Sequence, residues 1–262
     1  MPHTNSYVLG EYLKLMLVSV NGMGKTRGYA SFPDPMYVFD FDNRMSTIKK
    51  DFPDRAIEYD SYNFSNIDKF KSKIDSLVNY CPYLTVVLDS ITSCTTSVVL
   101  YSLQETGGKI LAKTNVPSFD EYSVETTLVT KFLEIFKMLQ ERKDAHVIVT
   151  AHPVERLSTT GQGKTMTITK TRPIVTYGNK LSSIIPDYFD EVWVLQQLVS
   201  SGGDREYIVL TQSTEDEMAK TSLPLPTSIP LTNKRLFLEV QNELTKHNIK
   251  LTTTKPQGIQ IK

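Results

Sequence analysis

The residues with the clearest chemical meaning lie in a glycine-rich stretch near the N-terminus. An apolar run ends at Val18, and the small-residue loop after it closes on Gly24-Lys25-Thr26. In a phosphate-binding loop, backbone N–H groups face the phosphates, the lysine brings positive charge to the β- and γ-phosphate oxygens, and the threonine hydroxyl binds Mg²⁺. The full pattern, G-x-x-x-x-G-K-[ST], has a glycine where this chain has Ser19, so a chance Gly-Lys-Thr turn is the alternative. The residues expected to bind nucleotide are Asn21, Gly22, Met23, Gly24, Lys25, Thr26 and Arg27.

An aspartate ends a second apolar run, at residues 84–88. Such a short and nearly continuous run is typical of a strand buried on both faces of a parallel sheet. An acid in this position is expected to hold the Mg²⁺ shell, which makes Thr26 and Asp89 the candidate metal-binding residues. The alternative for Asp89 is a cap for the following helix.

Two further strand ends carry polar groups that could act on a phosphate. A strand expected over residues 36–42 ends in Asp40 and Asp42, whose alternate spacing places both on one face. Asp42 is the preferred group for orienting or deprotonating an attacking water, and Asp40 is expected to support the loop; a solvated strand end or a helix cap is the alternative. His152 ends a strand expected over residues 146–152, and it is expected to contact the γ-phosphate or the water, with a half-buried loop histidine as the alternative. The candidate catalytic residues are Lys25, Asp42, Asp89 and His152.

A basic segment follows His152, at residues 153–178. It carries four positive charges against Glu155 alone and is rich in threonine and glycine, which fits a flexible loop that grips a nucleic-acid backbone. The alternative is a solvated hairpin around residues 166–169. Arg172 and Lys180 could instead act on the nucleotide of a neighbouring subunit. The residues expected to contact DNA are Arg156, Lys164, Lys170 and Arg172.

The elements that must position these groups follow from the hydrophobic pattern. Apolar runs of strand length alternate with stretches of helical spacing, such as residues 67–80 and 124–142. This alternation predicts an α/β fold with a mostly parallel central sheet flanked by helices. Ligands bind such sheets at the carboxyl ends of the strands, where all the candidate residues of the phosphate site fall. Residues 91–122, rich in serine and threonine, are expected to form in part a mobile loop.

Composition narrows the class of protein. The chain has 262 residues with 29 basic and 29 acidic side chains, so any contact with nucleic acid must come from a local patch. Cys81 and Cys94 lack metal-type spacing and are expected to be free buried thiols of a reducing compartment. We expect a cytoplasmic protein without membrane contact, because no apolar run approaches roughly 18 residues and the N-terminus lacks a signal-peptide pattern.

In their order along the chain, these motifs resemble the core of the RecA-like P-loop ATPases. The order runs from the glycine-rich loop through the strand ending in Asp42, the Val-Val-Leu-Asp-Ser run at 86–90 and the strand before His152 to the basic segment and Gly-Asn-Lys-Leu at 178–181. The chain looks most like the phage-encoded, single-domain RecA-like ATPases of the AAA type, which are linked to single-strand annealing and recombination. The similarity covers roughly residues 10–212, so residues 1–212 are expected to form the ATPase core and 213–262 a small C-terminal extension of linker, helix and tail.

The resemblance implies what the chain binds and does. It implies that Asp42 activates water, with aspartate where glutamate is usual, and that His152 senses the γ-phosphate. The segments near 93–115 and 153–178 fall where the two DNA-binding loops of the family lie. ATP, Mg²⁺, single-stranded DNA and a homo-oligomeric ring or filament are therefore expected, with a single-strand-binding or replication protein as a further candidate partner and the host cytoplasm as location if the protein is viral.

Three functions remain in view. The first is an ATPase that binds single-stranded DNA and assists phage-type recombination or replication. The second is a nucleotide-gated interaction or scaffolding protein with weak hydrolysis, for which Ser19 and Asp42 leave room. The third is a packaging or helicase-type motor on the same core.

Overall fold

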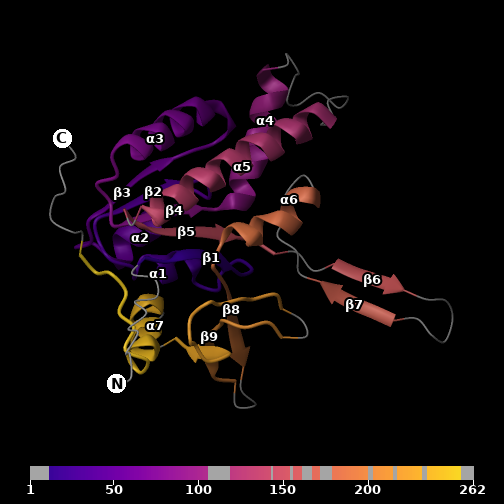
Figure 1. The fold of residues 1–262 in the computed structure, drawn as a ribbon. Helices are drawn as coiled ribbons and strands as arrows, with labels where there is room; N and C mark the ends of the chain where they lie inside the picture. Colours follow the sequence, from indigo (N-terminus) through magenta and orange to yellow (C-terminus); the bar gives the residue numbers. More distant parts are fainter. Residues whose placement is uncertain are drawn as a thin grey trace, which may run out of the picture.

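The structure is a computed structural model of the chain, and Figure 1 shows its fold. The residues that it describes are 12–105, 119–142, 144–153, 156–160, 167–171, 179–199, 203–214, 217–231 and 235–254.

An eight-stranded sheet forms the centre of the molecule, in the order β10-β9-β8-β1-β5-β4-β2-β3. All neighbours from β8 to β3 run parallel, whereas β9 and β10 add an antiparallel edge. Strands β1, β2, β4 and β5 are buried at every position, as expected of apolar runs covered on both faces. This confirms the predicted α/β fold with a mostly parallel sheet. The strands are β1 (Lys14–Val18), β2 (Met36–Asp40), β3 (Ile57–Ser61), β4 (Thr85–Asp89), β5 (His146–Ala151), β8 (Glu191–Val199), β9 (Arg205–Leu210) and β10 (Ser228–Pro230).

Helices cover both faces of this sheet (Figure 1). The period-two geometry of β1 shows the division, because Met16 and Val18 join one apolar cluster while Leu15 and Leu17 join the other. The first cluster lies under α3 (Ile67–Asn79), α4 (Ile91–Glu105), α5 (Phe119–Glu141) and α6 (Asn179–Ile184). The second lies under α1 (Lys25–Tyr29), α2 (Met45–Asp51) and α7 (Leu236–Thr245). Short 3-10 turns, Phe64–Asn66 and Ile185–Tyr188, lie before α3 and after α6.

The first part of the Ser- and Thr-rich stretch after β4 is helical, and the mobile loop expected in part of this stretch stays a prediction. Helix α4 occupies its first 15 residues, and residues 106–118 lie outside the described part of the chain. Ile91, Cys94 and Val98 recur at helical spacing and are buried. The hydroxyls of Thr95 and Thr96 donate to the carbonyl of Thr92 within the same helix, so these residues need no outside partner. Serine and threonine have a low helix propensity, but packing against α5 outweighs it over residues 91–105.

The basic segment after β5 contains a separate two-stranded antiparallel sheet, which projects from the body of the molecule (Figure 1). Its strands are β6 (Arg156–Thr160) and β7 (Thr167–Thr171). Within the described part of this segment, residues 156–160 and 167–171 pair as in the hairpin considered as an alternative, consistent with their β-branched threonines.

The described residues after 212 pack onto the rest of the sheet. Strand β10 pairs with β9, and the N–H of Phe237 at the start of α7 donates to the hydroxyl of Ser31 after α1. Val240 and Leu244 of α7 are fully buried. The last described segment, around Leu251, also reaches the core.

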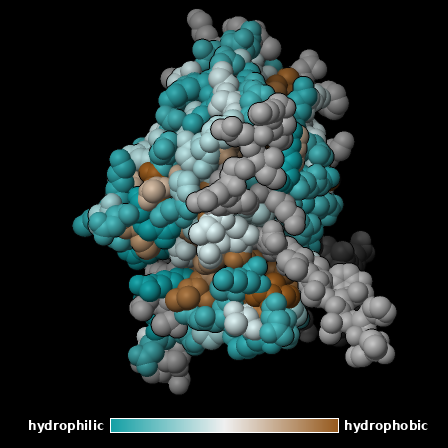
Figure 2. Space-filling model, turned by 60° about the vertical axis from the view of Figure 1, so that its left-hand side comes forward, coloured by the Kyte–Doolittle hydropathy of each residue, from teal (hydrophilic) through white to brown (hydrophobic). Residues whose placement is uncertain are grey.

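The two cysteines of the chain are buried thiols. Neither Cys81 nor Cys94 forms a disulfide, as predicted. Within the described part of the chain, no helix is long and apolar enough to cross a membrane. Hydrophilic side chains predominate on the face shown in Figure 2, where hydrophobic residues form small separate patches.

Candidate nucleotide-binding site

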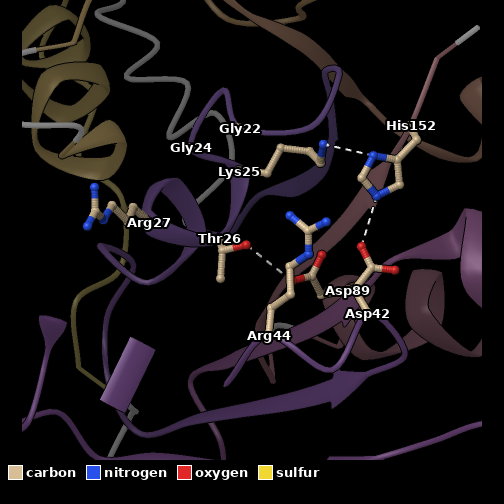
Figure 3. A pocket seen from close by; sticks show the side chains of 9 residues that line it. All are labelled: Gly22, Gly24, Lys25, Thr26, Arg27, Asp42, Arg44, Asp89 and His152. Atoms are coloured by element: carbon tan, nitrogen blue, oxygen red, sulfur yellow. Dashed lines mark hydrogen bonds and ion pairs between the residues drawn. The ribbon is translucent and has the colours of Figure 1, made fainter. Parts of the chain in front are cut away.

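The candidate residues meet at one edge of the sheet, where four neighbouring strands end. In the sheet register, Val18 of β1 lies beside Ala151 of β5, and Asp40 of β2 lies beside Asp89 of β4. The segments that follow these strands therefore converge above a single pocket (Figure 3). The pocket is lined by Gly22, Gly24, Lys25, Thr26, Arg27, Asp42, Arg44, Asp89 and His152.

The glycine-rich loop folds tightly around the lysine side chain. Gly22 and Gly24 have φ of 84° and 93°, a conformation that favours glycine, and Gly24 is the N-cap of α1. Ser19, the residue in place of the first glycine, keeps a negative φ and is 1% exposed. Its N–H donates to the Ala151 carbonyl over 3.2 Å. The incomplete motif is therefore accommodated without backbone strain at Ser19.

Lys25 is held inside the loop. Its Nζ donates to the carbonyl of Ser19 at 2.6 Å and to the carbonyl of Val20 at 3.3 Å, and it lies 3.1 Å from Nδ1 of His152. Burial lowers the pKa of Lys25 to about 8, repulsion from Arg44 adds to the lowering, and Asp89 and Asp42 oppose it. A buried ammonium held by neutral acceptors is a ready partner for phosphate oxygens.

His152 connects Lys25 to Asp42. Its Nε2 lies 2.8 Å from Oδ2 of Asp42, and its Nδ1 faces the Lys25 ammonium. Because an ammonium can only donate, Nδ1 accepts and Nε2–H donates to the carboxylate, which assigns a neutral imidazole with the proton on Nε2. Figure 3 shows the three side chains in a row.

Asp42 has further donors. The hydroxyls of Ser90 and Ser93 donate to its Oδ1 at 2.9 and 2.5 Å. Burial alone would raise the pKa of Asp42, but hydrogen bonds from His152, Ser93 and Ser90 outweigh it and lower the pKa to about 2. The carboxylate is therefore charged and fixed in position, but weakly basic.

Asp89 lies deeper. Its carboxylate accepts from Thr150 at 2.5 Å and from Tyr29 at 2.9 Å, and the hydroxyl of Thr26 lies 3.5 Å from Oδ2. Burial raises the pKa of Asp89. Among the described residues no group of three or more His, Cys, Asp or Glu side chains could hold a metal ion. The oxygen pair of Thr26 and Asp89 nonetheless fits Mg²⁺, which takes few protein ligands and keeps waters and substrate phosphates.

Asp40 and Asp42 do not share one face as the alternate spacing predicted. Strand β2 ends at Asp40, and the chain then turns so that the N–H groups of Phe41 and Asp42 both donate to the Asp89 carbonyl. Asp40 is buried, and its carboxylate accepts the N–H groups of Arg44 and Met45 at 3.1 and 3.2 Å. It supports the loop at the start of α2 and takes no part in the contacts of Asp42.

Several site residues were missed from the sequence. Thr150 and Tyr29 bind Asp89, Ser90 and Ser93 bind Asp42, and Arg44 lines the pocket. Thr150 and Ser90 could have been found, since each lies within two residues of a predicted strand end. The other three became visible only with the tertiary structure.

Other predicted residues lie apart from the central row. Arg27 lines the pocket, yet its guanidinium pairs with Asp51 at 2.6 Å and points away in Figure 3. Met23 packs against the second apolar cluster, and Asn21 accepts from Arg44. Of the candidate DNA-binding residues, Arg156 and Lys170 lie on β6 and β7, and Lys164 and Arg172 lie outside the described residues.

A parallel sheet, a lysine-bearing loop between β1 and α1, and an acid ending β4 define a P-loop NTPase. Family comparison agrees with this class. A protein-family model described as an AAA domain matches residues 11–223. Because the match covers most of the chain, the protein belongs to this AAA-domain family of P-loop NTPases. No curated protein matches the chain.

Nucleotide affinity should depend on the charge of Lys25. Below pH 8 the free protein carries the charged lysine, and above it the neutral form dominates. Phosphate binding favours the charged form, so we expect affinity to fall roughly tenfold between pH 7 and pH 9. Calorimetry in buffers of different ionisation enthalpy should show proton uptake on binding near pH 8. A flat affinity profile without proton uptake would contradict the position assigned to Lys25.

Proposed function

We propose that this protein is a Mg²⁺-dependent ATPase that binds single-stranded DNA and assists phage-type recombination or replication. The observation that carries the proposal is the row Lys25–His152–Asp42, which joins the phosphate loop to a carboxylate through a histidine that precedes β6 by four residues in the sequence. The membership of the AAA-domain family supports the nucleotide half of the proposal. The basic hairpin and the resemblance to RecA-like ATPases support the DNA half.

Four side chains of the pocket have a defined task in this proposal. The N–H groups at the start of α1 and the Lys25 ammonium bind the phosphates and stabilise the charge that develops during phosphoryl transfer. Asp42 orients a water for attack. Thr26 and Asp89 would hold Mg²⁺, which supplies charge neutralisation when bound.

In this proposal, His152 connects the nucleotide site with the DNA-binding segment. Its side chain contacts Lys25 and Asp42, and its N–H donates to the hydroxyl of Thr92 in α4 at 3.0 Å. Helix α4 leads into the segment around 106–118, and β6 starts four residues after His152. A phosphate that competes for Lys25 would disturb the contacts of His152 with Lys25 and Asp42 and could thereby act on α4 through Thr92.

A second candidate is a nucleotide-gated interaction protein with weak hydrolysis. The engagement of Asp42 by three donors favours it, because a carboxylate with a pKa of about 2 is a poor base. The same residues would then bind nucleotide without rapid turnover. Hydrolysis in the first proposal is accordingly expected to be slow without DNA.

The discriminating experiment is ATP turnover with and without single-stranded DNA, over a range of protein concentrations. Stimulation by DNA that disappears in Lys25→Ala supports the first proposal. A rise in specific activity with concentration supports assembly into a ring or filament. Nucleotide binding with neither stimulation nor a mobility shift by DNA at low salt would favour the interaction protein.

The basic hairpin should contribute to DNA affinity through phosphate contacts. The test removes two positive charges, with Lys170→Gln on β7 and Arg172→Gln two positions further along the sequence. This double variant should bind all DNA sequences similarly more weakly. The slope of log affinity against log salt should fall by about 1–2, as the loss of two phosphate contacts requires. The control is Lys246→Gln with Lys250→Gln, the same charge change on exposed residues of the C-terminal segment. An unchanged slope would remove the hairpin from the interface.

A further inference from the structure

Arg44 faces the phosphate site and has no ion-pair partner among the residues that the structure describes. Its guanidinium lines the pocket with Lys25, Asp42 and Asp89, and Figure 3 shows it pointing into the space between Thr26 and Asp42. Its printed hydrogen bond runs from Nη2 to Oδ1 of Asn21, at 3.2 Å. Among the described residues it forms no ion pair with a carboxylate.

The backbone of Arg44 is fixed from below. The buried carboxylate of Asp40 accepts its N–H and that of Met45, at 3.1 and 3.2 Å. Met45 itself is 1% exposed and anchors the start of α2 in the core. An exposed side chain thus extends from a rigid base, which lowers the entropy lost when it binds a ligand.

The contrast with Arg27 shows that this arrangement is specific to Arg44. Both arginines line the pocket, but Arg27 is neutralised by Asp51 at 2.6 Å and turns away. Arg44 instead contacts a neutral amide of the glycine-rich loop and bridges from the β2–α2 connection to that loop. Of the two arginines that line the pocket, only Arg27 forms an ion pair with a carboxylate among the described residues.

We propose that Arg44 binds the terminal phosphate of a nucleoside triphosphate from within the same chain and makes the site selective for triphosphate over diphosphate. This rests on the proposed nucleotide binding. The loop N–H groups and Lys25 bind the phosphates from the side of the glycine-rich loop, whereas Arg44 lies on the side of Asp42, where the attacking water is proposed to lie. A guanidinium suits this task because its planar fork can donate twice to phosphate oxygens.

The test measures ATP, a non-hydrolysable ATP analogue and ADP binding separately, by calorimetry with Mg²⁺ present, for the wild type, Arg44→Ala and Arg44→Lys. We expect Arg44→Ala to weaken triphosphate binding roughly 10- to 100-fold and ADP binding less than threefold, with Arg44→Lys between. Arg205→Ala is the matched control, because Arg205 is exposed on β9 and outside the pocket. Thermal unfolding checks that each variant is folded.

The outcomes separate the two proposals. If the wild type binds no nucleotide, the proposed function itself fails. If it binds ATP and Arg44→Ala binds ATP equally well, or loses ATP and ADP to the same extent, the selective contact with the terminal phosphate is overturned. In the second of those cases Arg44 only shapes the loop through Asn21.

Discussion

Replacing Lys25 with methionine should reduce ATP turnover by roughly 100- to 1000-fold, because it removes the charge that stabilises the transferring phosphoryl group. The same substitution should make the nucleotide-free protein more stable. The two effects have one cause, the placement of a charged amine in a buried loop. Burial destabilises the charged form of Lys25, and in the absence of phosphate no negative group of a ligand offsets this cost.

The gain in stability follows from the pKa of Lys25. A decrease from 10.5 to about 8 means that the charged form costs about 3 kcal/mol at neutral pH relative to the unfolded chain. Methionine has a similar length and no charge, but the carbonyls of Ser19 and Val20 lose a donor. We therefore expect a net gain of about 1–2 kcal/mol in the free energy of unfolding.

Denaturant unfolding of both proteins between pH 7 and 10.5 measures this effect. Between pH 8 and 10.5 the unfolded chain binds the lysine proton and the folded wild type does not, so wild-type stability should rise with pH and approach that of Lys25→Met. Lys50→Met, on an exposed position of α2, is the control and should change neither quantity. A loss of stability in Lys25→Met would show that the contacts of the ammonium outweigh its desolvation.

Acid should destabilise the fold through His146, by about 3 kcal/mol between pH 6.5 and pH 4. The ring is fully buried at the start of β5, between the aromatic rings of Tyr12, Phe32 and Phe237. Its Nδ1 accepts the N–H of Leu13 at 3.0 Å, and Nε2–H donates to the Thr252 carbonyl at 2.8 Å. In the neutral form each ring nitrogen has a hydrogen-bond partner. Protonation of Nδ1 would place its new N–H against the N–H of Leu13, and two donors cannot form a hydrogen bond with each other.

The pH window follows from the pKa. Burial lowers the pKa of His146 from 6.5 to about 4. Between these values the unfolded chain takes up a proton and the folded chain does not, so stability decreases as pH falls through this range and the loss levels off below pH 4. Carboxylates titrate in the same pH range, so the contribution of His146 must be separated from theirs with a variant at this position.

His146→Gln keeps a donor and an acceptor but does not titrate in this range. The difference in unfolding free energy between wild type and variant should shrink by about 3 kcal/mol from pH 7 to pH 4. Hydrogen exchange should show the N–H of Leu13 losing protection first, because its hydrogen bond to Nδ1 is the contact that protonation removes. Parallel stability curves for the two proteins would contradict the assignment of His146.

Local sequence determined much of this protein. The apolar runs at β1, β2, β4 and β5 identified buried parallel strands, because their burial on both faces leaves an unmistakable pattern. Since parallel strands end at one edge, the positions of Lys25, Asp42, Asp89 and His152 also predicted that these residues meet, and they line one pocket. Their catalytic roles stay predictions.

Only the tertiary structure decided how these residues are partnered. Lys25 and His152 are 127 positions apart, and Asp42 and His152 are 110 apart, so no local pattern could show that one imidazole joins both. The same holds for Arg44. Asp40 fixes its backbone and Asn21 accepts from its guanidinium, and neither contact is visible in the local sequence. Helix α4 was not predicted, because its burial against α5 outweighs the low helix propensity of serine and threonine and is not visible in the local sequence. Strand order and packing depend on contacts between residues that are distant in sequence. These contacts bring the incomplete phosphate loop together with Asp42, Asp89 and His152 in one pocket, where the partners of each charged group can be named.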